Sequence, residues 1–211
     1  MSTDQLEPNN IKSLYFKHPT LTHISGNPTY TDLQKLYKQA KENAQSVPWT
    51  HGGVSNGHLG LIINAITYAC INPETVYTRL TLPAALGSPP PNITQAQISE
   101  RLRFWNHQVG EHNLANKVKR IILNQLEEAL DEHILMPKIN EDTRIVTGAV
   151  TDLMTYLFDS FGDISDQNIN KERQKFINHT YVHSDSIANF FNFISKYTTM
   201  VDASGTPETD E

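Results

Sequence analysis

Nine histidines are the first residues of this 211-residue chain that suggest chemistry, because imidazole can act as a metal ligand and as a general base. His179 and His183 are four residues apart, which would place both on one helix face in a spacing that could bind zinc. No glutamate lies between them to act as the general base of a metal-dependent hydrolase. His58 lies in a glycine-rich stretch, where packing or backbone capping is a better interpretation than catalysis. We therefore expect no metal site and no catalytic histidine.

Acidic and sulfur-containing residues do not complete a catalytic arrangement either. The segment 202–205, Asp-Ala-Ser-Gly, superficially resembles the active-site loop of aspartic proteases, but it has one residue too many and follows a predicted helix rather than a strand. The carboxylates of residues 127–132 lack the Glu-x-x-His pattern of a di-metal site, so they predict a solvated helix face. The single cysteine, Cys70, excludes an internal disulfide and a Cys-based zinc knuckle, and it fits a reducing compartment. We expect no enzyme activity, no cofactor and no small-molecule substrate.

Two stretches could contact phosphate. The glycine-rich residues 49–60 lack the Gly-Lys-Ser/Thr ending of a phosphate-binding loop and no clear strand precedes them, so a flexible or closely packed turn is the better interpretation. Five basic residues near Phe104 and Trp105 could make a weak contact to RNA: Arg101, Arg103, Lys117, Lys119 and Arg120. Glu100 and Glu111 dilute their charge, so a solvent-facing charged helix is favoured over RNA binding.

Composition predicts a polar, intracellular protein. The formal net charge is −6, the pI is about 5.8 and the mean hydropathy is −0.45. An acidic chain is not suited to nucleic-acid binding over its whole surface, which requires clustered Lys and Arg. The first ten residues lack the charged-then-apolar pattern of a signal peptide, and the most apolar run, 59–71, is too short to span a membrane. We expect a cytoplasmic protein without a membrane partner.

Hydrophobic periodicity predicts an all-α chain. Residues 1–28 are polar and contain three prolines, so we expect a flexible arm with at most a short packed segment at 14–16. Helices are predicted from Thr29 or Thr31 to about residue 45, and from Thr94 to about residue 136 with one continuously apolar face. Gly110 would either split the second of these into two helices or bend it. Residues 59–70 fit a helix or a strand, and the helix is favoured because no other convincing strand could pair with it.

Residues 72–93 hold five prolines and predict an extended connection. A final helix with one inward-facing side is predicted from about residue 184 to 203. An acidic tail at 206–211 follows it and is expected to be disordered. The inward residues are expected to be Ile187, Phe190, Phe191, Ile194, Tyr197, Thr198 and Val201. Residues 29–205 would then form one domain.

A helical hairpin over residues 145–177 is the most regular feature of the sequence. Apolar residues recur at steps of three and four up to Phe161, and Gly162 follows where a left-handed C-cap is favourable. Ser165 could cap a second helix, whose buried side would include Ile169, Phe176 and Ile177. The residues expected to anchor the core are Leu153, Leu157, Phe158, Phe161, Gly162 and Ile164.

Several short motifs occur in a fixed order along residues 50–207. They are the segments 57–61, 68–69, 104–105, 156–158, 161–164, 185–191 and 203–207. Together they resemble the Gag polyprotein of copia-type LTR retrotransposons in its capsid region, with Leu-Phe-x-x-Phe-Gly-x-Ile at 157–164 and Gly-Thr-Pro at 205–207 as the most specific parts.

The resemblance implies a single multi-helix, capsid-like bundle that self-associates into a virus-like particle shell around the element's RNA, without catalysis. Its partners would be other copies of itself and, weakly, RNA. Gag proteins of this type often carry a Cys/His zinc knuckle, which this chain with its single cysteine does not have. The alternative is a nucleic-acid-binding or regulatory module derived from such a Gag, which does not itself form shells.

Overall fold

The computed structural model describes residues 8–49, 56–74, 80–162, 170, 173–175, 177–178 and 187–204. These residues are mostly helical and form no strand, which confirms the all-α class; two isolated β-bridges join Ile24 to Leu130 and Ile139 to Val146. The described elements are α1 (Pro8–Tyr15), α2 (Tyr30–Ser46), the 3-10 helix η3 (Leu59–Leu61), α4 (Ala65–Ile71), α5 (Gln95–Ala129), α6 (Glu132–Leu135), the 3-10 helix η4 (Met136–Lys138), α7 (Val150–Phe161) and α9 (Ile187–Ser204). None of these helices combines the length and the apolar character needed to cross a membrane.

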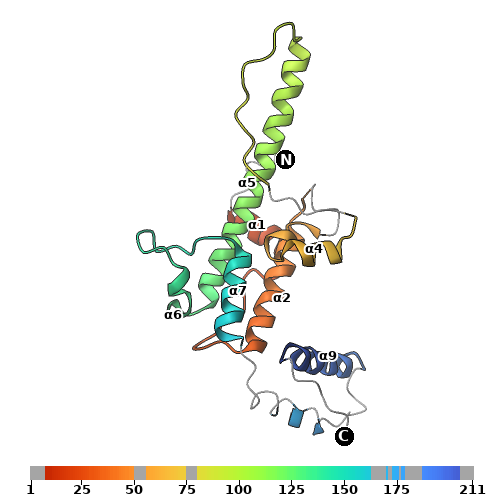
Figure 1. The fold of residues 1–211 in the computed structure, drawn as a ribbon, viewed down its shortest axis with the longest axis vertical. Helices are drawn as coiled ribbons and strands as arrows, with labels where there is room; N and C mark the ends of the chain where they lie inside the picture. The colour runs from red at the N-terminus through yellow and green to blue at the C-terminus, as the bar shows by residue number, and fades with distance from the viewer. Residues whose placement is uncertain are drawn as a thin grey trace.

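Helices α2, α7 and the C-terminal half of α5 pack side by side and form the body of the protein (Figure 1). The most deeply buried side chains come from all three helices and include Leu36, Ile122, Leu126 and Leu157, each fully inaccessible to solvent. Burying a leucine or isoleucine in this way stabilises the fold by roughly 1.5–3 kcal/mol. The core is therefore the space between three helices that are distant in sequence.

Helix α2 begins where the sequence predicts. Thr29 is its N-cap: the Thr29 side chain accepts a hydrogen bond from the Asp32 amide at 3.3 Å, and the Asp32 carboxylate accepts one from the Thr29 amide at 3.1 Å. This reciprocal pair satisfies amides that a helix start otherwise leaves unpaired. Leu33, Leu36 and Ala40 then follow at helical spacing and are fully buried.

The expected flexible arm at residues 1–28 is wrong for residues 8–24. Helix α1 packs on α5, and Ile11, Phe16, Leu21 and Ile24 are all buried in the same core as α2 and α7. The Ile24 amide also donates to the Ala129 carbonyl at 2.8 Å. The apolar residues at 11–16 cover less than two helical turns and Leu21 and Ile24 follow a proline, so the sequence indicated at most a short packed segment and not that 8–24 is part of the domain.

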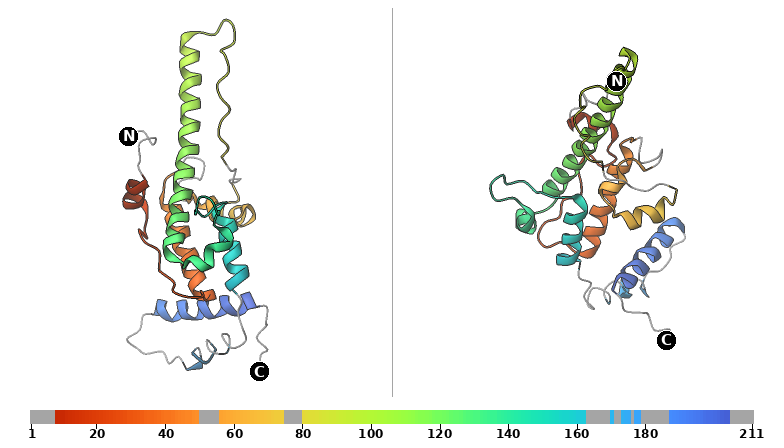
Figure 2. Two further views of the ribbon diagram at one scale, coloured as in Figure 1. Left: turned by 90° about the vertical axis from the view of Figure 1, so that its left-hand side faces the viewer. Right: turned by 45° about the horizontal axis from the view of Figure 1, so that its top comes forward.

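Helix α5 is continuous through Gly110, so of the two predicted alternatives the split into two helices is wrong, and at 35 residues the helix is about 52 Å long. It ends at Ala129 rather than near residue 136, because Leu130 is extended and pairs with Ile24. Its expected continuous apolar face is buried only from Gly110 onward, whereas Leu102 is 48% exposed. The N-terminal half of the helix projects from the body (Figures 1 and 2).

Residues 59–71 form two short elements instead of one helix. The turn η3 buries Leu59, and Asn64 then caps α4 by accepting from the Thr67 amide at 2.8 Å. Asparagine at this position starts a helix but disfavours continuing one. The helical interpretation is therefore right for 65–71, where Tyr68 is buried and Ile66 is 79% exposed.

The first helix of the predicted hairpin is present as α7, whereas its turn at 163–169 lies outside the described residues. Leu153 and Leu157 are buried, while Phe158 and Phe161 are half-buried against the core. Helix α7 begins at Val150 rather than near residue 145, because the preceding residues form the bridge of Val146 with Ile139.

Three expectations about the chain beyond α7 are wrong where the structure describes it. Gly162 ends α7 with φ −82°, so its C-cap is not left-handed. Ile177 is 63% exposed rather than buried, and Ile187, Phe191 and Thr198 of α9 are exposed rather than inward. Tyr197 and Val201 of α9 are buried as expected. Ile164, Ile169, Phe176 and the tail at 206–211 lie outside the described residues.

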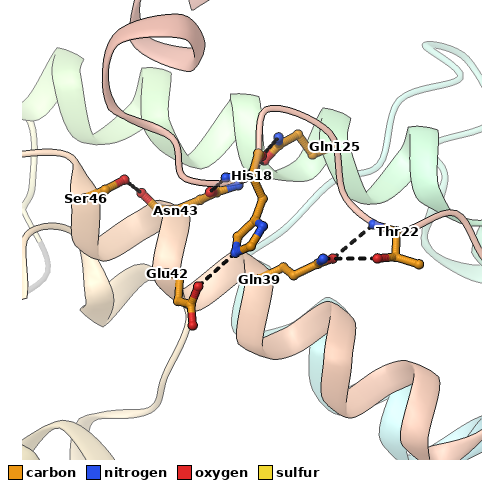
Figure 3. A network of polar contacts seen from close by, with 7 residues as sticks. All are labelled: His18, Thr22, Gln39, Glu42, Asn43, Ser46 and Gln125. Atoms are coloured by element: carbon orange, nitrogen blue, oxygen red, sulfur yellow. Dashed lines mark hydrogen bonds and ion pairs between the residues drawn. The ribbon is translucent and has the colours of Figure 1, made fainter.

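A network of amide side chains fixes the N-terminal segment to the body (Figure 3). Asn43 on α2 and Gln125 on α5 are both buried, and their side chains hydrogen-bond to each other at 3.0 Å. Asn43 also accepts from the His18 amide and donates to the His18 carbonyl, both at 2.8 Å. Gln125 donates to the carbonyls of His18 and Pro19, both at 2.9 Å. Buried polar groups that satisfy one another in this way define a single position for residues 18–19.

Candidate functional site

The most distinctive surface of the molecule is the projecting arm, which we define as residues 80–109: the extended connection 80–93 and the N-terminal half of α5. The connection runs beside the helix in both Figure 1 and Figure 2. Trp105 ties the two together, because its indole Nε1 donates to the Ala84 carbonyl at 2.8 Å.

Local sequence, rather than burial, starts the helix of the projecting arm. Asn92 turns the chain with φ 69°, a left-handed conformation that asparagine tolerates better than most residues. Thr94 is the N-cap; it accepts from the Gln97 amide at 3.3 Å, and the Gln97 side chain accepts from the Thr94 amide at 2.9 Å. Such a cap is worth about 1 kcal/mol and matters most where few side chains are buried.

Large apolar side chains remain exposed on the projecting arm. Leu102 is 48% and Phe104 63% exposed on the helix, and Leu82 is 63% and Leu86 36% exposed on the connection. Leu102 and Phe104 are two residues apart, about 200° around the helix, so they face opposite sides. Each of these two sides of the helix therefore carries an exposed apolar side chain among polar neighbours, which is typical of a protein contact surface. We therefore take the projecting arm as the candidate functional site.

The five predicted basic residues do not form one patch. Arg101 and Arg103 are exposed on the projecting arm, beside Phe104. Lys117, Lys119 and Arg120 lie within the body and are partly buried; Arg120 donates to the Val146 carbonyl at 3.3 Å. Sixteen residues of helix place Lys117 about 24 Å from Arg101 along the axis. The basic surface that the sequence predicted for RNA is thus reduced to Arg101 and Arg103.

The carboxylates of residues 127–132 are not simply a solvated face, as the sequence predicted. Glu127 accepts from the Val146 amide at 2.8 Å, and Asp131 accepts from the Gly26 amide at 2.8 Å. Glu132 pairs with Arg144, and Glu128 lies 3.5 Å from Lys12. These residues join neighbouring segments to the end of α5, which is a structural role.

His58 is a packed residue of a tight turn. It is 1% exposed, and its ring stacks on Trp49 with centroids 5.2 Å apart. Its Nδ1 lies 3.1 Å from the Val47 carbonyl, which can only accept, so Nδ1 carries the proton. Burial lowers the pKa of the His58 imidazole. In the described part of the glycine-rich stretch, residues 56–60, the chain is a closely packed turn against the end of α2.

Metal-ligating residues do not gather in the described part of the chain. Over those residues, no group of three His, Cys, Asp or Glu side chains is placed to hold a metal ion. Cys70 is exposed on α4, and His179 and His183 lie outside the described residues.

Comparisons of the chain with protein families, with characterised proteins and with solved structures find no match. The resemblance to copia-type Gag therefore rests on the sequence motifs. Self-association stays a prediction, and substitutions on the exposed surface of the projecting arm can test it.

Proposed function

We propose that the chain is a structural, capsid-like protein of the cytoplasm that self-associates through the projecting arm into a shell around retrotransposon RNA. The observation that supports this most is the exposure of Leu102 and Phe104 on opposite sides of a capped helix that stands away from the body. Because both side chains are already partly covered, covering the rest of either one on association would contribute roughly 1–2 kcal/mol before the cost of ordering the partners.

The two-sided arrangement favours a shell or lattice over a simple dimer. A single apolar side can be covered by one partner in a two-fold contact, after which association stops. Two opposite sides allow each copy to contact two neighbours, and repeated contacts of this kind close into rings or shells. Glu100, Arg101 and Arg103 place both signs of charge beside these side chains, so one arm offers complementary charges to another.

RNA has a secondary part in this proposal. Of the five basic residues predicted for RNA contact, Arg101 and Arg103 are the two that are exposed together, and the net charge of −6 opposes phosphate binding by the whole surface. The alternative function, a nucleic-acid-binding or regulatory module that does not form shells, was predicted to use all five basic residues, and Arg101 and Arg103 are the exposed pair among them.

Sedimentation velocity over a wide range of protein and salt concentrations tests self-association. We expect large assemblies of the wild-type chain and loss of assembly in the Leu102→Gln/Phe104→Gln double variant. Glutamine is a good helix former, so the variant should keep its helix content. Leu14→Gln is the matched control, because Leu14 is 66% exposed on α1, outside the projecting arm.

Two results would reject assembly through the projecting arm. One is a wild-type chain that stays monomeric under all conditions; the other is a double variant that assembles as well as the wild type. A monomer that binds RNA at low salt, and loses that binding in Arg101→Gln/Arg103→Gln, would favour the alternative function.

A further inference from the structure

We propose that the cavity between the His58 turn, α5 and the start of α7 binds a small organic phosphate that also carries a hydroxyl or amino group. This site is separate from the projecting arm and does not depend on the proposed function. The sequence predicted no small-molecule partner, because the residues that form the cavity come from segments far apart along the chain.

The cavity has a volume of about 330 Å³, within the range of small-molecule sites in proteins. One wall is the face of α5 that carries His112, Asn116 and Lys119, which lie at helical steps of four and three. The opposite walls are His58 with its stacked neighbour Trp49, and the first residues of α7.

His58 supplies the first reason to expect a ligand. The ring lines the cavity and is 1% exposed, and its Nε2 is buried without a hydrogen-bond partner. Because Nδ1–H donates to the Val47 carbonyl, the neutral ring presents a lone pair at Nε2. A buried acceptor without a partner costs about 1–3 kcal/mol. Nε2 has no accessible surface in this structure, so a hydroxyl or amino group of a ligand would satisfy it once a neighbouring side chain moves aside.

The start of α7 and Lys119 supply the second reason, and they select an anion. The N-cap of α7 is Ala149, which has no side-chain acceptor for the amides of the first turn, and Ala149, Val150 and Thr151 line the cavity. Helix N-terminal amides and the positive end of the helix dipole favour a phosphate or carboxylate. Lys119 lines the same cavity and adds a full positive charge.

Charge also orients the ligand. Asp152 reaches back only to the Ala149 amide, at 3.4 Å, and leaves the amides of the first turn without a side-chain cap. Buried Glu111 adds negative charge that acts on His58. The anionic group therefore belongs at Lys119 and the start of α7, and the hydrogen-bond donor belongs at His58.

Isothermal titration calorimetry with three probes tests the site: inorganic phosphate, ribose 5-phosphate and adenosine monophosphate. We expect one or both of the organic phosphates to bind more tightly than inorganic phosphate. Lys119→Met should weaken that binding at least tenfold. His58→Asn should weaken it about tenfold, since the asparagine amide can still donate to the Val47 carbonyl but leaves no acceptor at the position of Nε2. Lys38→Met is the control, because it removes the same charge from an exposed position on α2 and should bind like the wild type.

Circular dichroism of each variant separates loss of binding from loss of fold. The proposal is overturned if none of the three probes binds to the wild-type chain. It is also overturned if the folded Lys119→Met and His58→Asn variants bind as tightly as the wild type.

Discussion

Substituting Gly57 tests whether the glycine-rich turn is packed against the end of α2. Gly57 has φ +41°, and a Cβ built on it would lie closer than 3.0 Å to the backbone carbonyl oxygens of Ala44, Gln45 and Val47. The next amide, that of His58, donates to the Ala44 carbonyl at 2.9 Å, so the turn cannot move away without losing this bond. Gly57→Ala should therefore combine conformational strain with a steric clash against rigid backbone.

Gly26→Ala is the matched control. Gly26 also has a left-handed φ, +72°, but a Cβ there would have no atom within 4 Å. The left-handed conformation costs about 1–2 kcal/mol in both variants. Overpacking adds roughly 1–3 kcal/mol at Gly57 alone. We thus expect a loss of about 2–5 kcal/mol for Gly57→Ala and about 1–2 kcal/mol for Gly26→Ala.

Thermal and urea unfolding followed by circular dichroism measure this difference. For a chain of this size 1 kcal/mol corresponds to a change in Tm of about 2–4 °C, so Gly57→Ala should melt several degrees below Gly26→Ala. Equal, small losses in the two variants would refute the packing of this turn against α2, and with it the buried environment of His58.

Three further predictions concern the core. Gln125→Leu should destabilise the fold by about 1–3 kcal/mol, because Asn43 and the backbone at His18 lose buried hydrogen bonds. Limited proteolysis of this variant should then cleave within residues 8–24. A variant as resistant to protease as the wild type would contradict the role of this network. Burial lowers the pKa of His58 in the folded protein, so below pH 6.5 the unfolded chain binds more protons than the folded one. The free energy of unfolding should therefore fall as the pH drops below 6.5, by up to about 1.4 kcal/mol per pH unit. Urea unfolding of His58→Asn at a series of pH values should show that this part of the pH dependence is gone. If the free energy of unfolding of the variant changes with pH as steeply as that of the wild type, the prediction is refuted. Phe158→Asp should unfold the domain, because it places a charge against the core, whereas a fully helical and stable variant would show that this face is surface.

Local signals in the sequence were sufficient for the helix starts and for part of the core. Thr29 and Thr94 each precede a residue that completes a capping box, and both begin the helices as predicted. Leu153 and Leu157 repeat at helical spacing and are buried. The N-terminal segment gave no such signal, since its position depends on Asn43 and Gln125, which are 25 and 107 residues from His18 in sequence.

The projecting arm shows why periodicity alone predicted the wrong burial. Leu102 belongs to the same apolar series as Leu114 and Val118, yet it is exposed while they are buried. A helical period indicates which residues share a face, but not whether the same chain covers that face. The cavity at His58 had no sequence signal, because Lys119 and Ala149 meet it only through the packing of α5 and α7.

Electron cryo-microscopy of the assembled protein tests self-association through the projecting arm most directly. The proposal predicts particles or lattices in which residues 95–109 of neighbouring copies are in contact, with Leu102 and Phe104 both buried between copies. Assemblies whose contacts leave the projecting arm in solvent, or a chain that forms no assembly at any concentration, would contradict it.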